Sequence, residues 1–244
     1  MPSFHIESWN AVAPGLASPE DWERWLRDPV AIDEPLGKVD LSAIPALLRR
    51  RFSVLGRSAM AAALPLVEDI DGIPSIFASR HGDTALSLSM LEGIARGEPM
   101  SPTHFSLAVH NAVSGLFSIA RKDGSAVTAI AAMRGLVLQT LFEAIGQLQD
   151  SERVLCVIYD VPLPEFYQAH SDEAAQAFPY ALAMVLGNAA GARCRLESAG
   201  AGEAAAVAPF DFDAYGMLRL LCGIERDVIL AQDCSRWRLG RVDD

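Results

Sequence analysis

Apolar residues along this chain follow two patterns, short continuous runs and runs spaced for one face of a helix. Residues 73–79 (IPSIFAS) and 154–159 (VLCVIY) are short apolar runs that are typical of buried strands. Residues 84–96 and 136–148 place apolar side chains three and four positions apart, which predicts helices. Short strands separated by helices predict an α/β protein, with a layered fold, a mostly parallel mixed sheet and helices on both faces.

Further elements continue this alternation. Ser18 followed by Pro19 and two acidic residues is a helix-start signal, so a helix is expected over residues 20–27. No internal repeat or linker-like segment divides the chain, and a single domain over residues 1–244 is predicted. The remaining expected strands are residues 4–9, 181–186, 194–198 and 237–242, and the remaining expected helices are residues 43–51, 56–64 and 213–222.

Two segments without charged side chains predict burial. Residues 105–120 are mostly apolar and small, and a helix that is apolar on all sides is expected to be buried. Residues 126–132 (AVTAIAA) predict a strand that is buried on both faces. A sharp turn near Gly135 then leads from this strand into the next helix.

Composition and charge narrow the possible functions. About half of the chain (51%) is hydrophobic, which excludes intrinsic disorder. With 20 Lys and Arg against 31 Asp and Glu the formal charge is −11, which argues against a general nucleic-acid binder because phosphate contacts need clustered cations. No segment reads as a membrane span and the N-terminus lacks the features of a secretory signal, so a cytoplasmic protein is expected.

The motifs of common catalytic and metal sites are absent from the sequence. There is no GxxxxGK[ST], GxSxG or HExxH motif, and the four cysteines form no CxxC pair. His104 and His110 are six positions apart, so a helix would point them in different directions rather than at one metal ion. No cofactor and no metal are therefore expected, and the cysteines are interpreted as small buried residues.

The order of several segments resembles a known family. Residues 101–115 (SPTHFSLAVHNAVSG) precede the strand at 126–132, the sharp turn and the helix, as in the N-terminal half of a β-ketoacyl synthase of the thiolase-like superfamily. Residues 4–15 resemble the first strand and glycine loop of that family. Residues 49–63 (RRRFSVLGRSAMAAA) resemble its arginine–methionine–serine helix. The resemblance covers residues 3–160 well and the remainder loosely.

A subgroup of the family is similar in finer detail. Residues 79–83 (SRHGD) and 101–111 (SPTHFSLAVHN) resemble the stand-alone β-ketoacyl synthase-like N-terminal domain proteins. These proteins accompany aryl-polyene and xanthomonadin-type pigment pathways and are often described as chain length factors. The resemblance implies one thiolase-like half, about half the length of a full synthase.

Departures from the family pattern change the expected chemistry. In β-ketoacyl synthases the sharp turn presents a nucleophilic cysteine, and alignment on Gly124 places Met133 there, with Ala132 and Arg134 beside it. None of the three can attack a thioester as a thiolate does. The family's catalytic histidines and lysine belong to a second half that this chain does not reach. The resemblance therefore implies a catalytically inactive, non-condensing subunit of fatty-acid or polyketide-type biosynthesis, similar to a chain length factor, and no catalytic residue is assigned.

The resemblance also implies a protein partner. In such folds the strand before the turn pairs with its twin across a dimer axis. A homodimer, or a heterodimer with a ketosynthase, is therefore expected through residues 125–132. Small uncharged side chains suit this arrangement, because an edge strand that presents them is open to pairing.

Two alternative functions remain open. His110 and Ser114 are four positions apart, so on one helix they could meet and serve an acyltransferase or thioesterase acting on acyl-carrier thioesters. The simpler interpretation is a hydrogen-bonded core histidine and a small packing serine. The chain could instead bind an acyl chain or an acidic acyl carrier protein. The candidate docking residues, which otherwise form only a solvated helix end, are Arg49, Arg50, Arg51 and Arg57.

Overall fold

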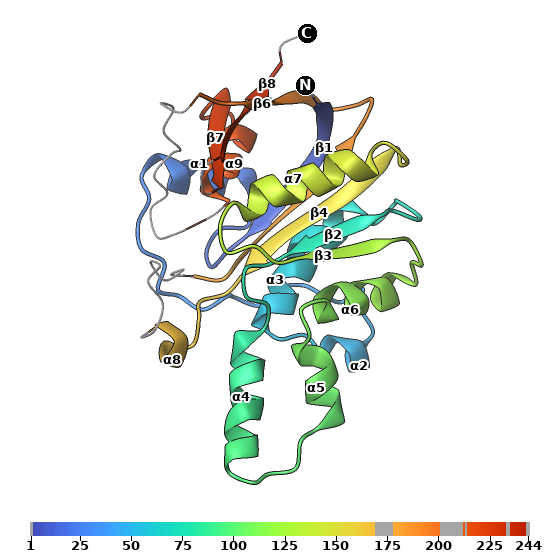
Figure 1. Cartoon of the computed structure of the whole chain (residues 1–244), viewed down its shortest axis with the longest axis vertical. Helices are drawn as coiled ribbons and strands as arrows, with labels where there is room; N and C mark the ends of the chain where they lie inside the picture. The colour runs from blue at the N-terminus through green and yellow to red at the C-terminus, as the bar shows by residue number, and fades with distance from the viewer. Residues whose placement is uncertain (1, 169–177, 201–211, 213, 233–234, 243–244) are drawn as a thin grey trace.

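The computed structural model describes residues 2–168, 178–200, 212, 214–232 and 235–242, through which one mixed sheet runs (Figure 1). Its strands are β1 (Ser3–Val12), β2 (Ser75–Ala78), β3 (Val127–Ile130), β4 (Arg153–Asp160), β5 (Tyr180–Gly187), β6 (Ala192–Ser198), β7 (Asp227–Gln232) and β8 (Ser235–Arg241). They lie in the order β3-β2-β4-β5-β1-β6-β8-β7. Helices pack on both faces, which confirms the predicted α/β class.

The pairing directions differ from the predicted mostly parallel sheet. β2 is parallel to β3 on one side and to β4 on the other, whereas the other five neighbouring pairs of the described sheet are antiparallel. The prediction is wrong for β1 and for the C-terminal strands, because an apolar run indicates a buried strand but not the direction in which its neighbours run. β5 and β6 both flank β1, and β7, which the apolar pattern did not reveal, forms a hairpin with β8.

Two apolar cores fill the space between the sheet and its helices. On one face α3 (Val54–Ala63) packs against β4, β5 and β1 through small buried side chains such as Ala59 and Ala62. On the other face lie α7 (Leu136–Gln147), α1 (Pro19–Arg27) and α9 (Tyr215–Leu221). None of the described helices is long and apolar enough to cross a membrane. The shorter helices are α2 (Ala46–Arg49), the 3₁₀ helix η1 (Leu64–Leu66) and α8 (Glu165–Gln168).

The start of α1 confirms the predicted helix signal. Ser18 Oγ accepts a hydrogen bond from Asp21 N at 3.2 Å, and the Asp21 carboxylate accepts bonds from the Ser18 backbone N–H and hydroxyl. The bond from the Ser18 hydroxyl lowers the pKa of Asp21 below its usual value. Trp22 is buried one residue further on, and its Nε1 donates to the carbonyl oxygen of Ala11 at 2.9 Å. The indole of Trp22 therefore joins α1 to β1 through this hydrogen bond.

Strands β6, β8 and β7 continue the sheet beyond β1, and β8 and β7 contact α7. Phe142 of α7 meets Trp237 of β8 edge to face, with ring centroids 5.0 Å apart. Gln139 of α7 donates a hydrogen bond to the side chain of Gln232 at the end of β7. These contacts cover a side of α7 that the central strands do not reach.

Helices α4 (Thr84–Ala95) and α5 (Pro102–Ala108) extend away from the sheet at the bottom of Figure 1, and we call residues 84–108 the arm. No residue of the arm is buried. The prediction of one buried helix over residues 105–120 is wrong for its first part, because the helix is interrupted between α5 and α6 (Ala112–Arg121) and Phe105 is 57% exposed. It is confirmed for α6, where Val113, Leu116 and Phe117 are buried. An apolar composition indicates burial but does not say whether the same chain supplies the cover.

The strand that was predicted to be buried on both faces lies at the edge of the sheet. β3 alternates exposed and half-buried residues along its length. It pairs with β2 on one side, and no described strand pairs with its other side. The prediction of burial is therefore wrong for the isolated chain, because an apolar run does not reveal which strand comes last in the sheet.

Candidate functional site

The candidate site lies where the carboxyl ends of β2, β3 and β4 meet. These three strands are parallel to one another, so the segments that follow them share one edge of the sheet, where α/β proteins form their sites. Ser79 follows β2, the turn at residues 131–135 follows β3, and Asp160 ends β4. Ser79 N donates to the carbonyl oxygen of Ile130 at 3.1 Å, which joins the first two segments directly.

The turn from β3 into α7 carries the three residues at the expected nucleophile position. Met133 is 50% exposed, Arg134 is exposed, and Ala132 packs partly against the core. Gly135 caps α7 with φ of 66°, and a Cβ there would lie 2.8 Å from Gln232 Cβ. The sharp turn expected from the sequence is therefore present. It exposes a thioether, which lacks the ionisable proton of a thiol.

A buried carboxylate organises the backbone beside this turn. Asp160 is 2% exposed, and its Oδ1 accepts hydrogen bonds from Ser79 Oγ at 2.8 Å and from Arg80 N at 2.9 Å. Ser79 Oγ in turn accepts a bond from Gly82 N at 2.9 Å. The sequence analysis missed Asp160, although an acid that ends a strongly apolar strand is a recognisable signal. Among the described residues, no group of His, Cys, Asp and Glu side chains is placed to hold a metal ion.

The structure does not place His110 and Ser114 on one helix. His110 lies in the break between α5 and α6, and its Nε2 is 2.9 Å from the carbonyl oxygen of Ser79. Because a carbonyl oxygen only accepts, Nε2 carries the proton and donates. Ser114 is buried in α6, and its hydroxyl donates to the carbonyl oxygen of Asn111 at 2.9 Å. Both side chains bind the backbone, and His110 is half-buried rather than a core residue. The arrangement does not favour a Ser–His nucleophile.

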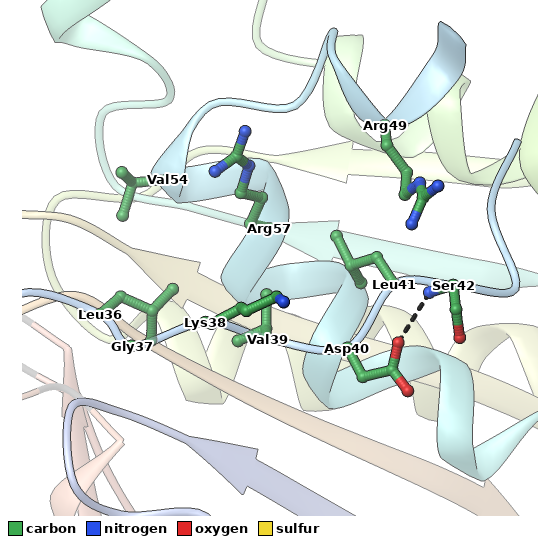
Figure 2. A pocket seen from close by; sticks show the side chains of 10 residues that line it. All are labelled: Leu36, Gly37, Lys38, Val39, Asp40, Leu41, Ser42, Arg49, Val54 and Arg57. Carbon is green, nitrogen blue, oxygen red and sulfur yellow. Dashed lines mark hydrogen bonds between the residues drawn. The ribbon is translucent and has the colours of Figure 1, made fainter. Parts of the chain in front are cut away.

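Two of the four predicted docking arginines line a pocket. Arg49 of α2 and Arg57 of α3 line a pocket of about 670 Å³ together with the loop that precedes α2, and the Arg49 side chain points toward that loop (Figure 2). Lys38, on that loop, adds a third cation that the sequence analysis missed. Arg50 and Arg51 are exposed and do not line the pocket. The cluster is therefore divided between a concave and an open surface.

One carboxylate shares the pocket with these cations. Ser42 N donates to Asp40 Oδ1 at 2.8 Å, as Figure 2 shows. This bond and the Ser42 hydroxyl lower the pKa of Asp40, and the charges of Arg49 and Lys38 lower it further. With three cations and one anion on its walls, the pocket is positive in a chain that is negative as a whole.

Exposed apolar side chains gather in one stretch of the chain. Of the twelve large apolar residues that are most exposed in the described part, eight lie within residues 91–133. They occupy the arm, the segment between α5 and α6, α6 itself, β3 and the turn after β3. A concentration of exposed apolar side chains is typical of an interaction site in a folded protein. The eight are Leu91, Ile94, Met100, Phe105, Val109, Ile119, Val127 and Met133.

Cys156 and Cys194 are expected not to react with iodoacetamide in the native protein at neutral pH. Both are fully buried, and burial raises the pKa of Cys194 to about 11 and also raises that of Cys156. The thiolate, which is the reactive form, is therefore scarce. Peptide mass spectrometry after labelling of native and urea-unfolded protein measures this. Native labelling of either residue would contradict a role in packing. Cys234 lies outside the described residues.

Comparison with known proteins by sequence gave one family match. The profile described as β-ketoacyl synthase, N-terminal domain, matches residues 22–217. Comparison with curated proteins gave no match.

Several solved structures are similar to this one. A chain in the complex of the ketosynthase ApeO with its chain length factor ApeC from Xenorhabdus doucetiae is 28% identical. It superposes with a TM-score of 0.84, and the match covers 99% of this chain and 100% of that one. The ishigamide ketosynthase/chain length factor is 11% identical, with a TM-score of 0.63 over 93% of this chain and 72% of that one. The AntDE:AntF complex of a type II polyketide ketosynthase with its acyl-carrier protein is 14% identical, with a TM-score of 0.56 over 77% and 63%. The similarity to the last two structures shows a shared fold only.

Proposed function

Because the chain belongs to the β-ketoacyl synthase N-terminal domain family, as its match over residues 22–217 shows, we propose that it is a non-condensing subunit similar to a chain length factor. In this proposal it is a cytoplasmic protein that pairs with a ketosynthase in the polyketide-type synthesis of an aryl polyene pigment. The likeness to a chain of a ketosynthase–chain length factor complex, at 28% identity and over the whole of both chains, supports the proposal.

The open edge of β3 is the observation that carries the proposal. Ser75 N and Ser79 N bind the carbonyl oxygens of Ala126 and Ile130. Because backbone direction alternates along a strand, the N–H and C=O groups of Val127 and Ala129 point away from β2. A strand of the partner can therefore add to the sheet there, continuing it across the interface.

β7, the strand at the opposite edge of the sheet, is less open to the addition of a partner strand. β7 packs against α9 and α7, and its Ala231 carbonyl oxygen would lie only 3.0 Å from a Cβ at Gly135. β3 also contacts two helices, α6 and α7, but it carries none of the charged or proline residues that usually protect an exposed edge, whereas β7 begins with Asp227. This contrast favours β3 as the paired edge, in a homodimer or in a heterodimer.

The lack of condensing activity is proposed from the turn after β3. Loading of an acyl group requires a nucleophile that loses a proton as it forms the thioester. Met133 offers only a thioether at this turn, and Ala132 and Arg134 offer no alternative. The proposed role is therefore to support a ketosynthase that itself carries the chemistry.

Light scattering on the chain alone and on the chain coexpressed with a ketosynthase of the same biosynthetic system tests the proposal. We expect a heterodimer with the ketosynthase, or a homodimer of the chain alone. A monomer under both conditions would overturn the proposal. Mass spectrometry after incubation with an acyl-carrier thioester should show no covalent acyl adduct, whereas an adduct or rapid hydrolysis would favour the acyltransferase or thioesterase alternative.

The positive pocket favours a second candidate function, docking of an acyl carrier protein. Replacing Arg49→Glu and Arg57→Glu together is expected to weaken carrier binding at least about tenfold at low salt, because close charges of opposite sign are then replaced by like charges. The loss should shrink at about 0.5 M salt as screening increases. Fluorescence anisotropy with a labelled carrier protein measures both affinities.

A matched pair provides the control for this test. Arg50→Glu with Arg51→Glu changes the net charge equally but lies outside the pocket. A smaller effect of this pair supports docking in the pocket, and an equal effect indicates attraction by overall charge. Unchanged affinity for both pairs at low salt would identify the arginines as a solvated helix end.

A further inference from the structure

Side chains around Asp160 hold both ends of the arm. The Asp160 carboxylate binds Ser79 Oγ and Arg80 N, which fixes the direction in which the chain leaves β2 toward α4. The chain that returns from α5 is fixed by His110, whose Nε2 donates to the carbonyl oxygen of Ser79 at 2.9 Å. Ser79 is therefore bonded from both sides, and it is the point at which the outgoing and returning segments join.

His110 also packs against the segment that enters α4. Gly82 has φ of 64°, and a Cβ there would lie 3.2 Å from His110 Cδ2. Gly82 N donates to Ser79 Oγ, and the adjacent Asp83 caps α4 by accepting a bond from Leu86 N at 3.1 Å. A chain of hydrogen bonds thus runs from Asp160 to the first turn of α4, with the imidazole against its side.

These bonds matter because the arm has few contacts with the body of the protein. Its two helices pack on each other, α5 also contacts α6, and no residue of the arm is buried. Leu91, Ile94 and Phe105 are each more than half exposed. An arm that swivels at its base would lose conformational freedom when it binds, which weakens association, whereas an arm with a fixed base avoids that cost.

We infer that His110 is a positioning residue for partner binding, which fixes the orientation of the apolar arm relative to the strand β3 that carries the open edge. The inference rests on the proposed function, and the partner is the ketosynthase that β3 pairs with. The same Ser79 that accepts the His110 bond donates its N–H to Ile130 at the end of β3. One residue therefore sets the arm and the edge strand relative to each other, so that both can meet the ketosynthase at once.

Two substitutions of His110 test this inference. His110→Ala removes the donor, and His110→Gln keeps an amide N–H that can reach the Ser79 carbonyl oxygen. Affinity for the ketosynthase is measured together with the melting temperature and the amide hydrogen exchange of residues 84–108 in the free chain. For H110A we expect roughly 3- to 10-fold weaker binding, the effect of one ordinary hydrogen bond, and faster exchange in the arm. H110Q should restore both values to within about twofold.

Each outcome decides the inference. The inference is overturned if H110A binds the ketosynthase with wild-type affinity. It is also overturned if H110Q binds as weakly as H110A while the amide exchange of the arm is unchanged in both variants. If H110A does not fold, Gly82→Ala takes its place, because its Cβ presses on the His110 ring, and unchanged binding and exchange would then overturn the inference. A wild-type chain that does not bind a ketosynthase overturns the proposed function instead. Arm exchange in the free chain still reports whether His110 holds the base.

Discussion

Ala129→Pro is expected to weaken pairing with the ketosynthase at least about 100-fold while the chain stays folded. The Ala129 N–H points away from β2, so proline removes no hydrogen bond within the chain. The same N–H is the central donor for a partner strand, and the proline ring also blocks the close approach of that strand. The loss of one or two bonds and of the strand contact corresponds to roughly 3 kcal/mol or more.

Two measurements separate loss of pairing from loss of folding. Light scattering and a binding assay report association, and urea unfolding of the free chain should change by about 1 kcal/mol or less, as expected for proline at an open edge. Ala129→Ser, which keeps the N–H and a small side chain, is the matched control and should bind within about threefold of wild type. Full-strength pairing by A129P would show that β3 is not the joined edge.

Gly135→Ala is expected to lower the free energy of unfolding by roughly 2–4 kcal/mol. Gly135 adopts φ of 66°, where a side chain costs about 1–2 kcal/mol. Its added Cβ would also lie 2.8 Å from Gln232 Cβ and 3.0 Å from the Ala231 carbonyl oxygen. Because β7 has no room to accept this atom, the start of α7 or the end of β7 must move, which disturbs the buried contacts of α7.

The same substitution elsewhere in α7 controls for the loss of a glycine. Gly146→Ala places its Cβ in open space at the other end of the helix, where alanine is expected to stabilise by about 0.5 kcal/mol. Urea or thermal unfolding of both variants gives the comparison. If G135A proved as stable as G146A, then β7 would not press on the start of α7, and the C-terminal hairpin would not secure the turn that carries Met133.

Much of the fold could be predicted from local patterns. The apolar run at residues 154–159 lies within β4, and Ser18 begins α1 as its capping signal indicated. The turn before α7 was also predicted, because small residues followed by Gly135 and a helical pattern are a local feature. Such signals can be recognised in the sequence because they depend only on a few neighbouring residues.

The polar part of the site could not be found in this way. Ser79 and Asp160 are separated by 81 positions and meet only because β2 and β4 are neighbouring parallel strands. His110 reaches Ser79 from 31 positions away, although helical spacing had suggested Ser114 as its neighbour. An argument from helical spacing holds only while the helix is continuous. The helix is interrupted after α5, so the four-residue spacing of His110 and Ser114 does not bring their side chains together.

The sequence by itself determined which segments are apolar, where α1 and α7 begin, and that the turn at Met133 carries no thiol. The tertiary structure alone decided the strand directions, the position of β3 at the edge and the exposure of the arm. The physical reason is that an apolar pattern shows that a surface favours burial. It does not say whether the cover comes from the same chain or from a partner. For residues 126–132 and 105–120, an apolar composition therefore predicted burial where the isolated chain leaves an open edge and an exposed arm.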